Sequence, residues 1–161
     1  MISLTIIVPV FNESKTILKI IKKIKSINIS KQIIIVDDHS VDGTREKLIK
    51  NKFKIDKLLF HKKNLGKGAA VKTAQKYIKG KFVIIQDADL EYDPNDYKKL
   101  IKPLILNKSL VVYGSRVLGK KRYKSKNFIS LVRVFFNHVL TLISNLINNQ
   151  SLTDAHTCYK I

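Results

Sequence analysis

The stretch IIIVDDHSVDGT, from Ile33 to Thr44, sets the expected fold. Its first four residues are apolar and would be buried on both faces of a strand, which is typical of a parallel sheet with helices on both sides. Asp42-Gly43 then supplies a turn, and a hydroxyl or carboxylate at this point caps the helix that follows. One aspartate of the pair Asp37–Asp38 is left to point into a cleft. The segment therefore predicts a strand–turn–helix unit of an α/β protein.

The rest of the chain repeats this alternation of short apolar runs with amphipathic stretches. Apolar residues at helical spacing after Asn12, a good N-cap, predict a helix, and further helices are expected to start near Thr44, Gly66 and Pro94. From Phe128 to Ile147 a long, very apolar helix is expected, which suits a groove or a membrane surface, with an ordinary core helix as the alternative. The predicted strands are Leu4–Val10, Gln32–Val36, Leu58–Phe60, Phe82–Ile85 and Leu110–Tyr113.

Length and composition indicate a single domain, residues 1–161, with its own core. The formal charge of +19 attracts phosphates, nucleic acid and anionic lipids alike, although a Lys/Ile/Asn bias also arises from an AT-rich genome. Cys158 is the single cysteine, so no intrachain disulfide forms and a cytosolic location is expected. Without a basic leader or an 18-residue uncharged apolar stretch, neither a signal peptide nor a membrane span is expected.

Acidic residues follow three of the predicted strands. Glu13 comes after the first strand, Asp37 and Asp38 end the second, and Asp87 and Asp89 end the fourth. Ligands of open parallel sheets bind beyond the carboxyl ends of the strands. Five of only twelve acidic residues on one edge, in a chain of charge +19, therefore predict a site.

Asp87 and Asp89 are two residues apart at a strand end, so both carboxylates can face one cation. Mg²⁺ or Mn²⁺ takes one or two protein carboxylates and completes its shell with water and substrate phosphate, so the pair predicts a diphosphate ligand. Glu91 could add a ligand directly or through water. The alternative is a solvated acidic turn leading into the helix at Pro94.

Three further features favour a nucleotide. A carboxylate accepts hydrogen bonds only, so Asp38 at a base site would favour uracil or guanine over adenine. Phe11 could stack on that base, although a lone Phe more often packs in the core. The small residues of Leu65–Ala70 would expose backbone N–H groups and Lys67 to a phosphate, but they lack the spacing of a Walker loop or of a dinucleotide fingerprint.

Six motifs in this order resemble the inverting family-two glycosyltransferases, and most closely their polyisoprenyl-phosphate branch, of the dolichyl-phosphate mannosyltransferase type. The similarity covers nearly the whole chain. It implies a GT-A (Rossmann-like) sheet with a C-terminal apolar amphipathic helix, and transfer of a sugar, with inversion, from a UDP- or GDP-sugar to a polyprenyl phosphate. The motifs are VPVFNE (8–13), IIIVDDHSVDGT (33–44), NLGKGAAV (64–71), QDADLEYDP (86–94), YGSR (113–116) and LTDAHTCYK (152–160).

The resemblance also implies roles for individual residues. Asp87 and Asp89 would hold the metal on the diphosphate, where Lys67 or an arginine would stabilise the leaving group. The residues that would line the nucleoside pocket are Pro9, Phe11, Glu13 and Asp38.

On the acceptor side, Arg116 and Arg133 fall where the family places arginines near the acceptor phosphate and the transferred sugar. The guanidinium fork suits phosphate oxygens, with a surface ion pair as the alternative for either arginine. Asp154 is the candidate base if the acceptor is a hydroxyl, with capping of the turn after Thr153 as the alternative. His156 departs from the residue type expected there.

The expected partners are the sugar donor, the polyprenyl phosphate and the inner face of a membrane, which the protein would bind peripherally from the cytoplasm, with no nucleic acid. Members of the family commonly continue beyond the position of Ile161. A chain that is shorter than the family at its C-terminus, and that is inactive for this reason, is therefore one expectation. One alternative is transfer to a saccharide hydroxyl in cell-envelope polysaccharide synthesis. A sugar nucleotidyltransferase would open with a Gly-rich signature that is missing here, and a basic nucleic-acid-binding module leaves the acidic edge unexplained. An inactive nucleotide-binding remnant is the last alternative.

Overall fold

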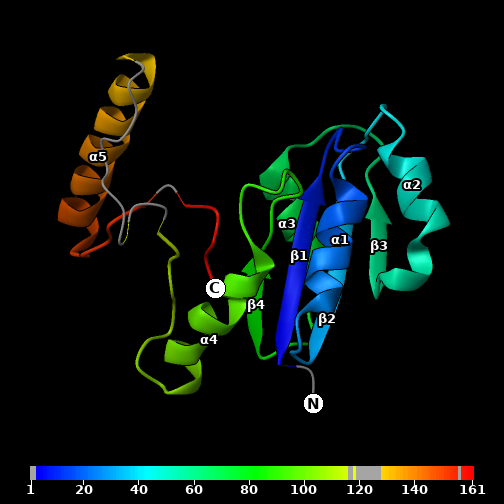
Figure 1. Ribbon diagram of the computed structural model, residues 1–161, viewed down its shortest axis with the longest axis horizontal. Helices are drawn as coiled ribbons and strands as arrows, with labels where there is room; N and C mark the ends of the chain where they lie inside the picture. Colours follow the sequence, from blue (N-terminus) through cyan, green and yellow to red (C-terminus); the bar gives the residue numbers. More distant parts are fainter. Residues whose placement is uncertain (1–2, 116–117, 119–127, 156) are drawn as a thin grey trace.

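The computed structural model contains a sheet of four parallel strands with helices on both faces (Figure 1). It describes residues 3–115, 118, 128–155 and 157–161, without the side chains of residues 128–130. The strand order is β3-β2-β1-β4. The α/β class and four of the predicted strands are confirmed. The strands are β1 (Leu4–Val10), β2 (Lys31–Asp37), β3 (Lys57–Phe60) and β4 (Phe82–Ile85).

The helices divide between the two faces of the sheet because alternate residues of a strand face opposite sides. Ile6 and Val8 of β1 belong to the larger core, which they share with α1, α2 and α4. Ile7 belongs to the second core, with Ala70 and Ala74 of α3. The helices are α1 (Ile17–Ser26), α2 (Thr44–Lys50), α3 (Lys67–Gln75), α4 (Tyr97–Ile105) and α5 (Phe128–Asn148), with 3-10 turns η1 (Lys52–Lys54) and η2 (Pro94–Asp96).

The strand order reverses between β1 and β4. β2 and β3 lie on one side of β1, and β4 lies on the other. The last paired residues of β1 and β4 are Ile7 and Ile85, after which the Gln86 N–H donates to the Ile7 carbonyl at 2.9 Å. Open α/β sheets bind ligands at this reversal, beyond the carboxyl ends of the strands. The fold therefore brings the segments after β1 and β4 to the expected ligand position.

The predicted N-cap of the first helix is wrong. α1 begins at Ile17, and Asn12 has a positive φ of 55°. The Asn12 side-chain oxygen accepts from the Val41 N–H at 2.9 Å. Asn12 therefore ties the turn after β1 to the turn after β2, because its short amide tolerates the left-handed backbone and bonds to a neighbouring loop.

Leu110–Tyr113 was predicted as a strand, and this is wrong as well. Val112 exchanges two backbone hydrogen bonds with Ile161, at 3.0 and 3.1 Å, and Tyr113 forms an isolated antiparallel bridge with Lys160. Leu110 is 96% exposed. The apolar run pairs with Lys160 and Ile161 and not with a strand of the sheet, so no further strand of the described sheet forms there.

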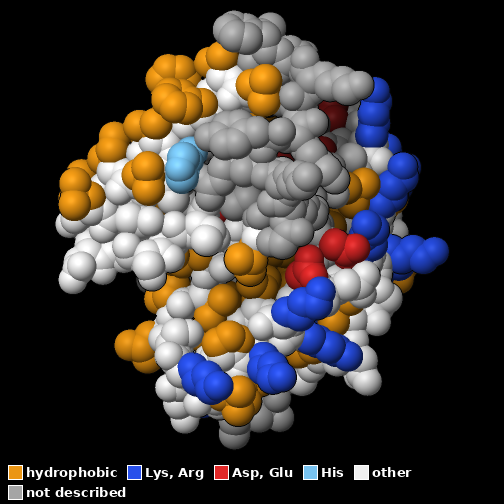
Figure 2. All heavy atoms as spheres, turned by 60° about the vertical axis from the view of Figure 1, so that its left-hand side comes forward, with side chains coloured by type: hydrophobic (Ala, Val, Ile, Leu, Met, Phe, Trp, Pro, Cys, Tyr) orange, Lys and Arg blue, Asp and Glu red, His pale blue; other side chains and the backbone are white. Residues whose placement is uncertain are grey.

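Helix α5 follows the predicted range and lies apart from the sheet in Figure 1. Its alternative as a core helix is wrong, because most of its large apolar side chains are exposed and gather on the face seen in Figure 2. By length and composition alone, the window Leu131–Asn148, which includes Arg133, is apolar enough to cross a membrane, and the expectation that no part of the chain spans a bilayer stays a prediction. The exposed apolar residues are Val132, Phe135, Phe136, Leu140, Leu142, Ile143, Leu146 and Ile147.

The segment after α5 holds this helix. The side chain of Asn145 donates to the Leu152 carbonyl at 2.9 Å and accepts from the Leu152 N–H at 3.0 Å. The Thr141 hydroxyl, which is buried, accepts from the Ala155 N–H at 3.4 Å. α5 is thus fixed to residues 151–155 by polar contacts, while its apolar side chains stay exposed.

Candidate functional site

The end of β4 places a carboxylate against an ammonium. Asp87 Oδ1 lies 2.5 Å from Lys67 Nζ, and Lys67 is the first residue of α3. Burial alone would lower the pKa of Lys67, but the hydrogen bond and the charge of Asp87 raise it above its usual value. Lys67 therefore stays charged at neutral pH and presents a cation at the edge of the sheet.

Asp89 follows in an exposed turn with an unusual backbone. Its Oδ1 accepts from the Glu91 N–H at 2.9 Å, and Leu90 between them has a φ of 70°. A large side chain rarely adopts this left-handed region, and such strain persists where the surrounding structure enforces it, commonly at binding and catalytic sites. The backbone of this turn is therefore strained at Leu90, and its alternative as a solvated acidic turn stays open.

The two aspartates fit a hard cation only in part. Within the described ranges, no group of three or more His, Cys, Asp or Glu side chains is placed to hold a metal ion. The predicted set of Asp87, Asp89 and Glu91 is therefore not assembled, because Asp87 pairs with Lys67 and Asp89 bonds to the backbone of its own turn. Two carboxylates still match Mg²⁺ or Mn²⁺, since these ions take their other ligands from phosphate and water.

The carboxylates after β2 have structural partners. Asp37 is fully buried and accepts from Arg45 Nε at 2.9 Å, while Arg45 Nη2 donates to the His61 carbonyl. Asp38 is 3% exposed and accepts from the Leu65 and Gly66 N–H groups, at 2.9 and 2.7 Å. The acidic residues thus lie on the predicted edge but do not form one cluster.

Asp38 also contacts His61, whose Nδ1 lies 2.6 Å from Asp38 Oδ1. Burial alone would raise the pKa of Asp38, but the hydrogen bonds from Leu65, His61 and Gly66 lower it. With three donors, about one acceptor position of this carboxylate is left for a base, so the contact between Asp38 and a base stays a prediction.

The turn after β1 supplies the other side of the predicted nucleoside pocket. Phe11 is 47% exposed, so its alternative as a core residue is wrong and its ring is accessible at the edge. The Glu13 N–H donates to the Thr44 hydroxyl at 2.9 Å, and the Glu13 carboxylate accepts from the Thr16 hydroxyl. Pro9 is buried inside β1. Their contacts with a nucleoside stay predictions.

Gln86 fixes the direction in which β4 ends, a role that no sequence pattern indicated. Its Oε1 accepts from the hydroxyls of Tyr97 and Tyr159, both at 2.7 Å, and its Nε2 donates to the Asp87 carbonyl at 2.9 Å. Burial raises the pKa of both tyrosines, so both hydroxyls remain donors. The Gln86 side chain therefore fixes the Asp87 carbonyl at the start of the acidic turn.

Cys158 brings the end of the chain to the same edge, a role that its place in the last motif did not reveal. Its Sγ lies 3.4 Å from Lys67 Nζ, and its N–H donates to the Tyr92 hydroxyl at 3.0 Å. Burial raises the pKa of the thiol to about 12, so it is neutral at pH 7. Cys158 thus packs beside the Lys67–Asp87 pair as a neutral group.

The structure describes the residues predicted for the acceptor side only in part. Asp154 is buried in the segment after α5, and Arg133 is exposed on α5. Arg116 and His156 lie outside the described residues. The roles given to these side chains stay predictions.

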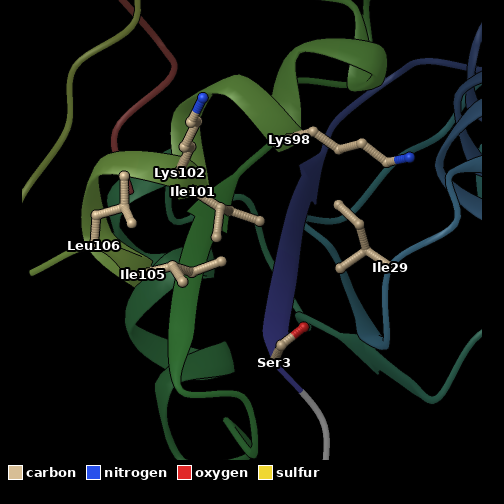
Figure 3. A pocket seen from close by; sticks show the side chains of 7 residues that line it. All are labelled: Ser3, Ile29, Lys98, Ile101, Lys102, Ile105 and Leu106. Carbon is tan, nitrogen blue, oxygen red and sulfur yellow. The ribbon is translucent and has the colours of Figure 1, made fainter.

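Two hollows flank opposite ends of the sheet. One of about 720 Å³ lies next to the acidic turn and includes Glu91, Asp93 and Asp96. The other, of about 340 Å³, lies at the amino ends of the strands and has no acidic lining residue. Figure 3 shows it beside the start of β1, with lining side chains Ser3, Ile29, Lys98, Ile101, Lys102, Ile105 and Leu106. The acidic hollow therefore belongs to the candidate site, and the apolar one does not.

The reversal of strand order, with charged groups beyond the carboxyl ends, defines a doubly wound α/β protein, the class in which ligands generally bind at that edge. The family model described as Glycosyl transferase family 2 matches residues 5–161. The chain belongs to this family, as the motifs predicted.

Individual relatives agree with the family. A dolichyl-phosphate beta-glucosyltransferase of Saccharomyces cerevisiae is 33% identical over 184 residues, which cover 99% of this chain and 54% of the yeast protein. A UDP-N-acetylglucosamine–dolichyl-phosphate N-acetylglucosaminyltransferase of Methanococcus voltae is 30% identical over 170 residues, which cover 94% of this chain and 66% of that protein. The chain thus spans about half to two thirds of the length of these relatives.

A solved structure confirms the fold. S. aureus TarS, residues 1–349, superposes with a TM-score of 0.59 and 24% identity, over 68% of this chain and 34% of that one. The predicted GT-A sheet is therefore confirmed.

Proposed function

We propose that this chain is the donor-binding catalytic part of an inverting glycosyltransferase that moves a sugar from a UDP- or GDP-sugar to a polyprenyl phosphate at a membrane surface. One observation carries the proposal: Lys67 and Asp87 face each other at 2.5 Å at the reversal of the sheet, and the exposed Asp89 follows two residues later. An ammonium and two carboxylates at one edge match a diphosphate with its divalent cation, since each phosphate charge then meets a positive partner.

The side chains of this edge divide the work. Asp87 and Asp89 would hold Mg²⁺ or Mn²⁺, which would neutralise the negative charge that builds up on the departing nucleoside diphosphate. Lys67 stabilises the same charge directly, as its raised pKa keeps it protonated. Phe11 offers an aromatic face for the base at the other end of the edge.

The names of the relatives favour a lipid phosphate as the acceptor. The yeast and Methanococcus voltae proteins described above are both named as acting on dolichyl phosphate. A phosphate acceptor is already anionic near neutral pH, so it needs positioning by groups such as Arg116 or Arg133 more than deprotonation. With a saccharide hydroxyl as acceptor, Asp154 would be the base, and because this carboxylate is buried we make this the second choice.

Metal-dependent binding of the donor tests the proposal. In thermal unfolding, a UDP- or GDP-sugar with Mn²⁺ should raise the Tm of the wild type, and an ADP-sugar should not. Asp89→Ala removes an exposed carboxylate, so the fold should persist while the Mn²⁺-dependent shift is lost. At ligand a hundredfold above Kd, the wild type should gain about 2.7 kcal/mol.

The matched control is Asp56→Ala, which also removes an exposed carboxylate that accepts from a backbone N–H, that of Ile33, but precedes β3 at the opposite end of the sheet and should leave the shift unchanged. Equal stabilisation by all three sugar nucleotides, or by none, would contradict the proposed function. Binding that does not need the metal would reject the role of Asp87 and Asp89 alone.

The exposed apolar side chains of α5 should bind the protein to anionic vesicles. Changing Phe135 and Leu146 together to serine removes two of these side chains, and we expect vesicle binding in a flotation assay to fall at least about tenfold. The control is the same pair of changes at Phe53 and Leu110, which are also exposed but lie outside α5. An equal loss in the control, or none in the α5 variant, would exclude α5 as the membrane contact.

A further inference from the structure

His61 lies where three elements meet, directly after β3. Its Nδ1 contacts Asp38 Oδ1 at 2.6 Å, and its Nε2 contacts the Thr73 hydroxyl of α3 at 3.0 Å. Its backbone N–H donates to the Asp37 carbonyl at 2.9 Å, and its carbonyl accepts from Arg45 Nη2 at 3.0 Å. His61 is 8% exposed, so both ring nitrogens and both backbone groups are fixed inside the protein.

Asp38 connects this imidazole to the loop of residues 61–66. Asp38 Oδ1 accepts from both His61 and the Leu65 N–H, while Oδ2 accepts from the Gly66 N–H at 2.7 Å. A buried carboxylate is costly unless several donors hold it. Because the imidazole fixes Oδ1, the rotation of the Asp38 carboxylate is set. The directions from which its two oxygens accept the Leu65 and Gly66 N–H groups are set with it.

The backbone of the loop then sets the direction of Lys67. Gly66 has a φ of 86°, a conformation in which side-chain-bearing residues are strained, and α3 begins directly after it. Lys67 is therefore one residue away from the N–H that Asp38 holds, and its Nζ reaches Asp87 Oδ1 across the edge. A chain of contacts runs from Thr73 through His61, Asp38 and Gly66 to the Lys67–Asp87 pair.

We infer that His61 is a positioning residue, which through Asp38 holds the loop of residues 61–66 so that the Lys67 ammonium lies beside Asp87. The inference rests on the proposed function only in giving Lys67 and Asp87 to the diphosphate. Asp38 accepts a hydrogen bond from Nδ1–H in either charge state of the ring. Nε2 accepts from the Thr73 hydroxyl in the neutral form and donates to it in the protonated form. The contact with Asp38 thus persists in both forms.

Three variants separate the two contacts of the ring. In His61→Asn the side-chain amide nitrogen takes the place of Nδ1 and retains a donor for Asp38. In His61→Gln the amide nitrogen takes the place of Nε2, so the donor to Asp38 is lost. Thr73→Val removes only the contact with the hydroxyl.

Hydrogen exchange of the Leu65 and Gly66 amides measures the positioning directly. We expect exchange to be about tenfold faster in His61→Gln and close to wild type in His61→Asn and Thr73→Val, with the β1 amides still protected in all three. Unchanged exchange in His61→Gln would overturn the inference, as would equally fast exchange in His61→Asn. If His61→Gln does not fold, wild-type protection of Leu65 and Gly66 in His61→Asn supports the inference and its loss contradicts it.

A double-mutant cycle with Lys67→Ala shows whether the effect reaches the ligand. With Mn²⁺ and whichever of UDP and GDP the wild type binds, His61→Gln should raise Kd about tenfold, but should change it little when Lys67 is already alanine. Equal losses in both backgrounds would mean that His61 acts on the ligand by another route. If the wild type binds neither nucleotide, the proposed function fails, and hydrogen exchange at Leu65 and Gly66 still decides the role of His61.

Discussion

Replacing Gly80 with alanine should lower the free energy of unfolding by about 3 kcal/mol, because the new methyl group meets backbone that cannot move away. A Cβ at Gly80 would lie 2.5 Å from the Thr5 nitrogen and 2.7 Å from the Leu4 carbonyl carbon, both in the central strand β1. The Gly80 N–H also donates to the Thr5 hydroxyl at 2.9 Å, and the shift that relieves the clash would break this bond. Urea denaturation followed by circular dichroism measures the change.

Gly68→Ala is the matched control. Gly68 lies in α3, and a Cβ there would meet nothing within 4 Å. Alanine is the better helix former, so this variant should be more stable than the wild type by about 0.5–1 kcal/mol. If both variants lost the same stability, the close approach at Gly80 would not be the cause.

Gln86→Leu should cost about 3 kcal/mol of stability and also loosen the acidic turn. Leucine is close to glutamine in size, but the hydroxyls of Tyr97 and Tyr159 would lose their shared acceptor inside the core. A buried donor without a partner costs about 1–3 kcal/mol, and here two such donors arise. The Asp87 carbonyl would lose its donor too, so Mn²⁺-dependent nucleotide binding should weaken along with stability.

The single changes Tyr97→Phe and Tyr159→Phe serve as controls. Each removes one hydroxyl together with its need for a partner, and Gln86 Oε1 still accepts from the other tyrosine. Each should therefore cost about 1 kcal/mol. Should Gln86→Leu be no worse than either tyrosine variant, the three groups would not act as one network.

The sheet could be predicted from the sequence because its strands are buried on both faces. A run such as Ile33–Val36, apolar at every position, is typical of a strand covered on both faces. The predicted ends of β1 and β4 agree with the structure. Leu110–Tyr113 is also apolar, but it pairs with Lys160 and Ile161, a partner that no local pattern shows. Asn12 was mistaken for a helix cap because its bond to Val41 lies across the sheet edge, 29 positions away.

The candidate site was predictable in position and less so in contacts. The rule that ligands bind beyond the carboxyl ends of strands pointed to the edge at which the structure places Asp87 and Asp89. The rule does not say which carboxylates will bond to other groups of the protein. Asp37 accepts from Arg45, and Asp38 bonds to His61 and to the backbone N–H groups of Leu65 and Gly66. Those contacts depend on distant backbone geometry, so pattern and spacing could not reveal them.

The link between Gln86 and Tyr159 bears on how the protein matures during synthesis. The two residues are 73 positions apart, whereas the hydrogen-bonded pair Thr5 and Gln32 of β1 and β2 are separated by 27. Closing a longer loop is slower and entropically costlier, so the central strands can join while the ribosome is still adding residues. The geometry around Asp87 is settled only after Tyr159 has emerged from the exit tunnel, so the acidic edge reaches its final form later than the pairing of β1 with β2.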